Sequence, residues 1–359
     1  MSPETRILVT GAGGFIGGWI VETLYLNGFL NVRGGVRRWS TAARIGRCPV
    51  EIVLCDIANA QQVKAAMRDV DVVIHCAYGS RDSTVKGTGV LLEAAQQQKV
   101  RRLIHLSTID VYGGIEGEVD EESPLLNTGN EYGDSKIEAE KLCWRHAAWG
   151  FPVVVLRPTI VYGPFSKLWI TKFAERLRSG QWGVFKGTGD GTCNFVYVKD
   201  LVQAVFRAID SDKAVGQAFN INGSDMITWN EFFRRLNAAL KLPPLREIQP
   251  GKALFRSRVM AHVKSAARYL VDHFGDTITN IYKKSDLARR FMKRAESTMK
   301  VSPGPQELRM FGLNVHYKIS KAEALLGYKP EYDVRTGLDL SVEWLNHEAM
   351  FSHRASGTE

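Results

Sequence analysis

Residues 8–18 read LVTGAGGFIGG, and this stretch decides the fold that we expect. A short apolar strand runs into three glycines at the spacing G-x-x-G-x-x-G, namely Gly11, Gly14 and Gly17, and a helical pattern follows. In such a turn the first glycine permits the tight bend, the second lets backbone amides approach a pyrophosphate, and the third allows close helix–strand packing. The helix N-terminus adds amide donors and a positive dipole end. A flexible loop that merely caps a helix is the simpler interpretation, but the flanking strand and helix favour dinucleotide binding.

Short, β-branched strands alternate with helical segments through the first half of the chain. The expected strands are 6–10, 31–36, 51–55, 71–77, 102–108 and 152–158. Stretches of helical period, such as 84–98, lie between most of them. This alternation is typical of βαβ units in a parallel sheet covered by helices on both faces. Ligands of such sheets bind outside the carboxyl ends of the strands.

The second half of the chain has a mixed and less regular pattern. We therefore expect an α/β fold in which residues 1–165 form a Rossmann-type, doubly wound parallel sheet. Residues 166–359 are expected to form a smaller, mixed α/β substrate domain. The segment at about 193–225, which contains a strand leading into a helix and a further strand, is expected to return to the first domain.

The net charge of +9 is concentrated in one insertion at about 251–300, which carries 12 Lys/Arg and 4 Asp/Glu. Helix-breaking proline segments flank it at 242–245 and 302–305. Apolar residues recur within it at helical spacing: Phe255, Val259, Val263, Ala266, Leu270 and Phe274. A basic amphipathic helix of this kind suits contact with an anionic membrane, but it equally suits packing on the core or a lid over the substrate. Because the basicity is local, we expect no nucleic-acid partner.

Composition indicates a globular protein of the cytoplasm. Hydrophobic residues make up 45% of the 359 and charged residues 24%, and no apolar run reaches the roughly 18 residues of a membrane span. The five cysteines are odd in number and form no C-x-x-C pair, which argues against a disulfide framework or a zinc site. The N-terminus enters a strand without the pattern of a secretory signal. We expect a cytoplasmic protein, with peripheral membrane contact through 251–300 as the alternative.

The end of the second strand selects the cofactor. An NAD site normally places an acid there, whereas an arginine suits the 2′-phosphate of NADP. The chain reads VRGGVRRWS, with Arg37 and Arg38 and no acid nearby, so we expect NADP, with NAD as the alternative. Solvated loop arginines are the simpler interpretation. Asp56, after the third strand, is placed to meet the adenine amino group, or is an ordinary turn aspartate.

A tyrosine and a lysine four residues apart, Tyr132 and Lys136, share one helix face. A nearby ammonium lowers the pKa of a tyrosine hydroxyl and makes it a better proton-transfer group. Such a pair is common in surface helices by chance. Ser107 and Thr108 change this assessment, because they place hydroxyls at the carboxyl end of the fifth strand, where one can bond a substrate oxygen.

Together these motifs resemble the extended short-chain dehydrogenase/reductase family. The resemblance rests on TGAGGFIG (10–17), HLSTIDVYG (105–113), YGDSK (132–136), LRPTIVYGP (156–164) and NFVYVKDLVQA (194–204), and continues to residue 338. It implies Tyr132 as acid/base, Lys136 as its pKa modulator and ribose ligand, and Thr108 as the hydroxyl that orients the carbonyl, with Ser107 as the alternative. It implies cofactor contacts at Phe15, Ile16, Ile57, Ala77, Pro158 and Thr159 besides the residues above. It implies no metal, and a homodimer is a family expectation.

Two departures from the family pattern bear on the site. The usual asparagine of NVxGT is Thr84, which puts a proton relay through that position in doubt. The connection after HCAYGS (75–80) is unusually short.

The motifs favour a hydrophobic substrate over a nucleotide sugar. Nucleotide-sugar enzymes commonly carry an arginine where this chain has Cys193, and an asparagine where it has Ile160. Dehydratases place two acids where it has Ile109 and Asp110. The chain looks more like hydroxysteroid dehydrogenases and dihydroflavonol-type reductases. We therefore expect hydride transfer between a nicotinamide cofactor and a steroid-, lipid- or acyl-like alcohol or ketone, in lipid metabolism. A nucleotide-sugar epimerase or reductase is the alternative, and a non-catalytic dinucleotide-binding scaffold is a third.

Overall fold

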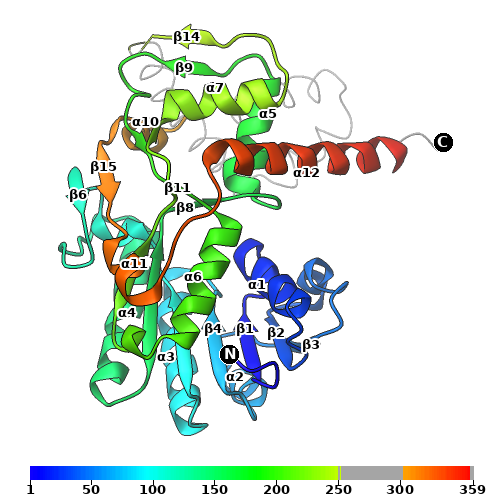
Figure 1. Ribbon diagram of the computed structural model, residues 1–359, viewed down its shortest axis with the longest axis vertical. Helices are drawn as coiled ribbons and strands as arrows, with labels where there is room; N and C mark the ends of the chain where they lie inside the picture. The colour runs from blue at the N-terminus through cyan, green and yellow to red at the C-terminus, as the bar shows by residue number, and fades with distance from the viewer. Residues whose placement is uncertain (250, 252–301, 356–359) are drawn as a thin grey trace, which may run out of the picture. The chain divides into compact units, whose positions relative to one another are not determined.

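The computed structural model describes residues 1–249, 251 and 302–355, and the chain divides into two compact units (Figure 1). Unit 1 comprises Met1–Gly163, Asn194–Asp225 and His316–Gly337; unit 2 comprises Pro164–Cys193, Met226–Val315 and Leu338–Glu359. Apart from residue 251, the insertion helix predicted at about 251–300 lies outside the described residues. In the described part of the chain, no helix combines the length and the apolar character needed to cross a membrane.

Unit 1 is built on a seven-stranded parallel sheet, as the sequence predicts. Its strand order is β12-β7-β5-β4-β1-β2-β3. The strands are β1 (Ile7–Thr10), β2 (Val32–Val36), β3 (Glu51–Leu54), β4 (Val72–His75), β5 (Arg102–Leu106), β7 (Val153–Pro158) and β12 (Ala218–Ile221). Every neighbouring pair is parallel, so the carboxyl ends of all seven strands meet at one edge. The order reverses at β1 and β4, the switch point at which such sheets bind ligands.

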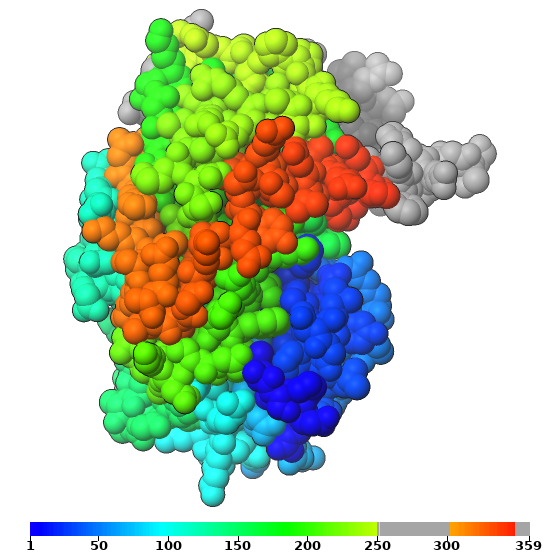
Figure 2. Space-filling view, viewed as in Figure 1, coloured from blue at the N-terminus to red at the C-terminus, as the bar shows by residue number. Residues whose placement is uncertain are grey.

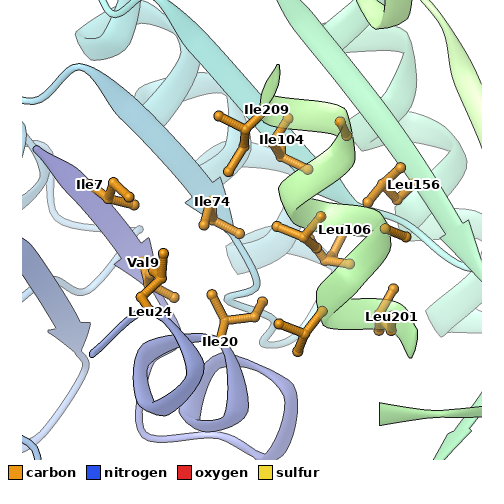
Figure 3. Close-up of a cluster of buried hydrophobic side chains, with 14 of the residues drawn as sticks. Ile7, Val9, Ile20, Leu24, Ile74, Ile104, Leu106, Leu156, Leu201 and Ile209 are labelled. Atoms are coloured by element: carbon orange, nitrogen blue, oxygen red, sulfur yellow. The ribbon is translucent and has the colours of Figure 1, made fainter. Parts of the chain in front are cut away.

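Helices cover both faces of this sheet because its strands are apolar on both sides. Ile7 and Val9 face α1 (Phe15–Leu26) and α6 (Val198–Asp210), in the core cluster drawn in Figure 3. Leu8, between them in the sequence, faces the opposite cluster, which includes residues of α2 (Ala60–Ala66), α3 (Arg81–Gln97) and α4 (Glu131–Ala148). Because side chains alternate between the two faces along each strand, the sheet contributes to two separate hydrophobic cores.

Shorter elements complete unit 1. They are η1 (Trp39–Arg44), η2 (Ile109–Tyr112), η4 (Asp212–Ala214), β6 (Gly117–Val119) paired with β15 (Val315–Tyr317), β8 (Ile160–Tyr162) paired with β11 (Phe195–Tyr197), and α11 (Ser320–Leu326). Residues 194–225 belong to this unit, close to the segment for which the sequence suggests a return.

One segment departs from the expected division, because residues 316–337 belong to unit 1 and not to the second domain. Tyr328 donates a hydrogen bond to the backbone oxygen of Asn222 at 2.9 Å. The backbone amide of Glu331 donates to a carboxylate oxygen of Asp200 at 2.8 Å. Figure 2 shows this segment, in orange, lying on the green surface of α6. Long-range contacts of this kind have no periodic signal in the sequence.

Unit 2 has a small aromatic core. Its elements are a π-helical turn (Lys167–Thr171), α5 (Lys172–Arg178), β9 (Gly183–Phe185) paired with β14 (Arg246–Ile248), β10 (Thr192–Cys193) paired with β13 (Ile227–Thr228), α7 (Trp229–Ala239), α10 (Pro305–Gly312) and α12 (Val334–Ala355), whose first turn belongs to unit 1. Phe173 and Phe233 pack with ring centroids 5.4 Å apart, and Trp229 and Phe311 with centroids 4.8 Å apart. The buried Arg176 pairs with Glu307 at 2.8 Å.

Candidate active site

The glycine turn connects β1 to α1 in the conformation that its spacing predicts. Gly11 has a φ of +68°, and a Cβ atom there would lie 2.8 Å from the amide nitrogen of Ala77. A Cβ atom at Gly17 would lie 2.4 Å from the carbonyl oxygen of Gly11, so only glycine permits this close packing. The helix begins after Gly14, which is exposed and offers no side-chain cap. No side chain therefore caps the first amides of α1 at the switch point, which fits a bound pyrophosphate.

Two exposed arginines follow β2, beside the glycine turn. Within the described residues, the Arg37 and Arg38 side chains form no hydrogen bond or ion pair. Arg44 and Arg47, farther along the chain, form ion pairs with Glu22 at 2.9 and 2.6 Å. The loop that follows Arg38 touches the turn: a Cβ atom at Gly13 would lie 2.3 Å from the carbonyl oxygen of Thr41. Unpaired positive charge thus lies where a 2′-phosphate is expected.

The other predicted cofactor residues surround the same edge. Asp56 accepts a hydrogen bond from the amide of Ala58 at 3.1 Å, so it does form a turn, and its contact with adenine stays a prediction. Ile57 is buried, and a Cβ atom at Gly87 would lie 2.6 Å from its side chain. Three further predicted residues, Phe15, Ile16 and Ala77, are half-buried.

At the end of β5, the structure separates the roles of Ser107 and Thr108. Ser107 donates its hydroxyl to the buried carboxylate of Glu140. That carboxylate pairs with the buried Arg157 at 2.7 Å, and Arg157 donates to the hydroxyl of Tyr112 at 2.8 Å. Ser107 is therefore committed to a buried network that joins β5, α4 and β7.

Thr108 is the hydroxyl that faces Tyr132. Its Oγ1 accepts a hydrogen bond from the amide of Asp110 at 3.2 Å, which caps η2. The Thr108 side chain also lies close enough to the Tyr132 hydroxyl to lower its pKa. The two hydroxyls predicted to work together thus lie near each other.

Tyr132 lies in the first turn of α4. The side chain of Asn130 caps this helix by accepting a hydrogen bond from the amide of Tyr132 at 3.2 Å, which fixes the turn. Burial raises the pKa of Tyr132 above its usual range, and the nearby Asp110 raises it further, whereas the Thr108 side chain lowers it. Tyr132 is therefore protonated at neutral pH and able to donate.

Lys136 lies one turn later and is buried, with its ammonium near the end of β5. Its Nζ donates to the carbonyl oxygen of Leu106 at 2.7 Å. Burial lowers the pKa of Lys136 to about 8, opposed by Cys76, Cys143 and Glu140. The expected lowering of the Tyr132 pKa by Lys136 is absent in this geometry: burial raises that pKa, and the Lys136 ammonium is bonded to Leu106. The role of Lys136 as pKa modulator and ribose ligand stays a prediction.

The structure gives local surroundings for three further residues named in the sequence analysis. The hydroxyl of Thr84 accepts from the amide of Gly79 at 3.1 Å, so it holds the start of α3. Thr159 donates to the side chain of Asn222 at 2.9 Å. Pro158 ends β7 and is buried.

The last residue of β4 is a buried, neutral histidine. His75 is fully enclosed between the hydroxyls of Thr10, at 2.8 Å, and Thr88, at 3.1 Å. Burial lowers the pKa of His75 to about 3 and also lowers that of His105, whose ring centroid is 5.2 Å away. Among the described residues, no group of three or more His, Cys, Asp or Glu side chains is arranged to hold a metal ion.

The sequence analysis missed Tyr78, which lies against both Tyr132 and Lys136. Its ring centroid is 4.9 Å from that of Tyr132, and the Nζ of Lys136 lies 5.8 Å from its ring centre. Its place three residues beyond the end of β4 was a usable signal, since ligands bind at the carboxyl ends of parallel strands.

Comparison with known proteins identifies the family of the chain. Residues 7–222 match the model of the NAD dependent epimerase/dehydratase family. The dTDP-D-glucose 4,6-dehydratase of Bos taurus is 31% identical, covering 60% of this chain and 67% of its own. The 2-alkyl-3-oxoalkanoate reductase of Shewanella oneidensis is 30% identical over 68% of this chain and 69% of its own. The 3beta-hydroxysteroid-dehydrogenase/decarboxylase isoform 1 of Arabidopsis thaliana is 26% identical over 96% of this chain and 80% of its own.

Solved structures share the fold. The UDP-glucose 4-epimerase of Thermotoga maritima superposes with a TM-score of 0.71 at 22% identity, covering 96% of this chain and 99% of that chain. The extent of the family match and the site at the sheet edge lead to one conclusion. The chain belongs to the NAD dependent epimerase/dehydratase family of extended short-chain dehydrogenase/reductase enzymes.

Proposed function

We propose that the protein is an NADP-preferring oxidoreductase that transfers a hydride between the nicotinamide ring and a hydrophobic alcohol or ketone. The observation that carries this proposal is the placement of Tyr132, kept protonated by burial, near the Thr108 hydroxyl at the carboxyl edge of the sheet. Two neighbouring hydroxyls, one of them a donor at neutral pH, suit a carbonyl oxygen that gains a proton as its carbon gains a hydride.

The chain provides a fitting cradle for the dinucleotide. The uncapped amides of α1 would hold the pyrophosphate, and the close packing at Gly11 and Gly17 brings the backbone near it. Lys136 would bond the nicotinamide ribose. When bound, the nicotinamide cofactor supplies or accepts the hydride.

The proton is handled by the side chains. In the reducing direction Thr108 orients the carbonyl oxygen and Tyr132 donates its phenolic proton to that oxygen. The raised pKa of Tyr132 favours this donor role at neutral pH. In the oxidising direction Tyr132 accepts the alcohol proton, which requires the phenolate, and the Lys136 ammonium would favour that form on leaving Leu106.

The preference for NADP rests on charge at the end of β2. Arg37 and Arg38 are exposed and unpaired within the described residues, and no acid occupies the adjacent positions that would bond a ribose 2′-hydroxyl. A guanidinium recognises a phosphate by paired, charge-assisted hydrogen bonds.

The hydrophobic substrate class is supported by the relatives. The hydroxysteroid dehydrogenase/decarboxylase aligns with 96% of this chain, and the oxoalkanoate reductase with 68%. Cys193, where nucleotide-sugar enzymes commonly carry an arginine, is fully buried and uncharged. Ile109 occupies one of the two acidic positions of dehydratases.

A nucleotide-sugar reaction is the second candidate, because dehydratases of dTDP-glucose are 31% identical to this chain. A parallel assay separates the two. The protein is incubated with NADPH or NADH and either hydrophobic ketones or UDP- and dTDP-glucose. Loss of nicotinamide absorbance in step with ketone reduction supports our proposal, whereas isomerised or dehydrated sugar without net change in absorbance contradicts it.

A further inference from the structure

Tyr78 has an unusual environment for a large aromatic side chain. It follows Ala77 in the loop after β4, and 48% of its surface is exposed, which sets it among the large hydrophobic side chains of the described residues that are open to solvent. Burial and the nearby Glu131 raise the pKa of Tyr78, which keeps it uncharged at neutral pH.

The covered part of Tyr78 rests on the predicted catalytic residues. Its ring meets that of Tyr132 edge-on, with an interplanar angle of 82° and a centroid separation of 4.9 Å. The Nζ of Lys136 lies 5.8 Å from its centre, within range of a cation–π interaction. The exposed remainder of the ring therefore borders the place where a substrate reaches Tyr132.

Several bonds fix this arrangement. The amide of Gly79 donates to the hydroxyl of Thr84 at 3.1 Å. The amide of Arg81 donates to the carboxylate of Glu131 at 3.2 Å, and the Arg81 guanidinium pairs with Glu138. Because Glu131 and Glu138 belong to α4, the loop that carries Tyr78 is tied to the helix that carries Tyr132.

We propose that Tyr78 is a specificity-determining wall of the active site, which selects flat, aromatic or fused-ring groups beside the reacting carbonyl. This inference rests on the proposed ketone reduction. A planar group can stack on or meet the edge of an immobilised ring, and such contacts contribute beyond area burial alone. A flexible alkyl chain gains only the burial.

The test compares acetophenone with 2-octanone, both reduced with NADPH, in the wild type and in Tyr78→Ala and Tyr78→Phe. We expect Tyr78→Ala to lower the ratio of kcat/KM for acetophenone over 2-octanone about two- to tenfold, in line with the strength of aromatic pairs. Tyr78→Phe retains the ring and should retain the ratio. Trp149→Ala removes an aromatic side chain that is 63% exposed at the far end of α4, and serves as the matched control.

A purely structural role gives a different result. If Tyr78 only supports Tyr132 and Lys136, Tyr78→Ala lowers kcat for both ketones by the same factor, and an unchanged ratio overturns the inference. Calorimetric titration of the protein–NADP⁺ complex with acetophenone adds a readout without turnover. We expect the acetophenone Kd to rise in Tyr78→Ala and to hold in Tyr78→Phe.

The titration also separates this inference from the proposed function. If the wild type binds acetophenone through Tyr78 but reduces neither ketone, the proposed function is wrong and the proposed role of Tyr78 in binding flat groups is supported. If both ketones are reduced, and Tyr78→Ala changes neither the acetophenone Kd nor the kcat/KM ratio, the proposed role of Tyr78 is wrong and the proposed function is supported. A wild type that binds no acetophenone at all overturns the wall.

Discussion

The ammonium of Lys136 donates a 2.7 Å hydrogen bond to the carbonyl oxygen of Leu106, the last residue of β5. This bond ties the helix that carries Tyr132 to the strand end that presents Thr108. It also holds a charge in a buried position, which lowers the pKa of Lys136 to about 8. Lys136 thus helps to hold Tyr132 and Thr108, the other two predicted catalytic residues, in place.

Burial of Lys136 should appear in the pH dependence of stability. Between pH 8 and 10.5 the unfolded chain keeps the Lys136 proton while the folded chain has lost it, so stability from this group rises with pH. In Lys136→Met this dependence is removed. We expect the unfolding free energy of the wild type, relative to the variant, to increase by up to about 3 kcal/mol from pH 7 to pH 10. Urea denaturation at the two pH values measures it, and a difference that does not change with pH would show that the amine is solvated.

Substitutions of Thr108 and Ser107 should affect different properties: Thr108 mainly kcat, and Ser107 mainly stability. Thr108→Val removes the hydroxyl beside Tyr132 and should lower kcat about 100-fold, as for the loss of one oriented donor. Because the same hydroxyl caps η2, the variant should also lose about 1 kcal/mol of stability. Ser107→Ala removes a donor to the buried Glu140 and should cost about 1.5–3 kcal/mol of stability with a modest change in kcat. Kinetics and urea denaturation of both variants decide the assignment. The reverse outcome would make Ser107 the catalytic hydroxyl.

Arg37 should control cofactor choice. Arg37→Ala is expected to raise the NADPH Kd about 10- to 100-fold, the effect of losing a charge-assisted hydrogen bond, and to leave the NADH Kd nearly unchanged. Arg47→Ala is the control, because Arg47 pairs with Glu22 instead. Fluorescence titration of the wild type and both variants with each cofactor gives the six dissociation constants. Tighter binding of NADH than NADPH by the wild type would refute the preference.

The fold was predictable from short-range signals, and the site in part. Three glycines at fixed spacing and a series of β-branched strands predicted the parallel sheet, because local geometry alone demands them. Contacts between distant segments were not predictable: the placement of 316–337 depends on Asp200 and Asn222, more than 100 residues away. The distinction between Ser107 and Thr108 likewise depends on Glu140, which the sequence marks only as a helical acid. Tyr78 was missed since no spacing links it to Tyr132.

The central claim is that Tyr132 gives its proton to the substrate carbonyl oxygen, and Tyr132→Phe tests it most directly. The variant keeps the ring that packs on Tyr78 and loses only the hydroxyl. We predict that kcat for NADPH-dependent ketone reduction falls about 100- to 10,000-fold, the usual contribution of a positioned acid, while the NADPH Kd stays within about twofold of the wild type. A kcat close to that of the wild type, with cofactor binding intact, would contradict the account.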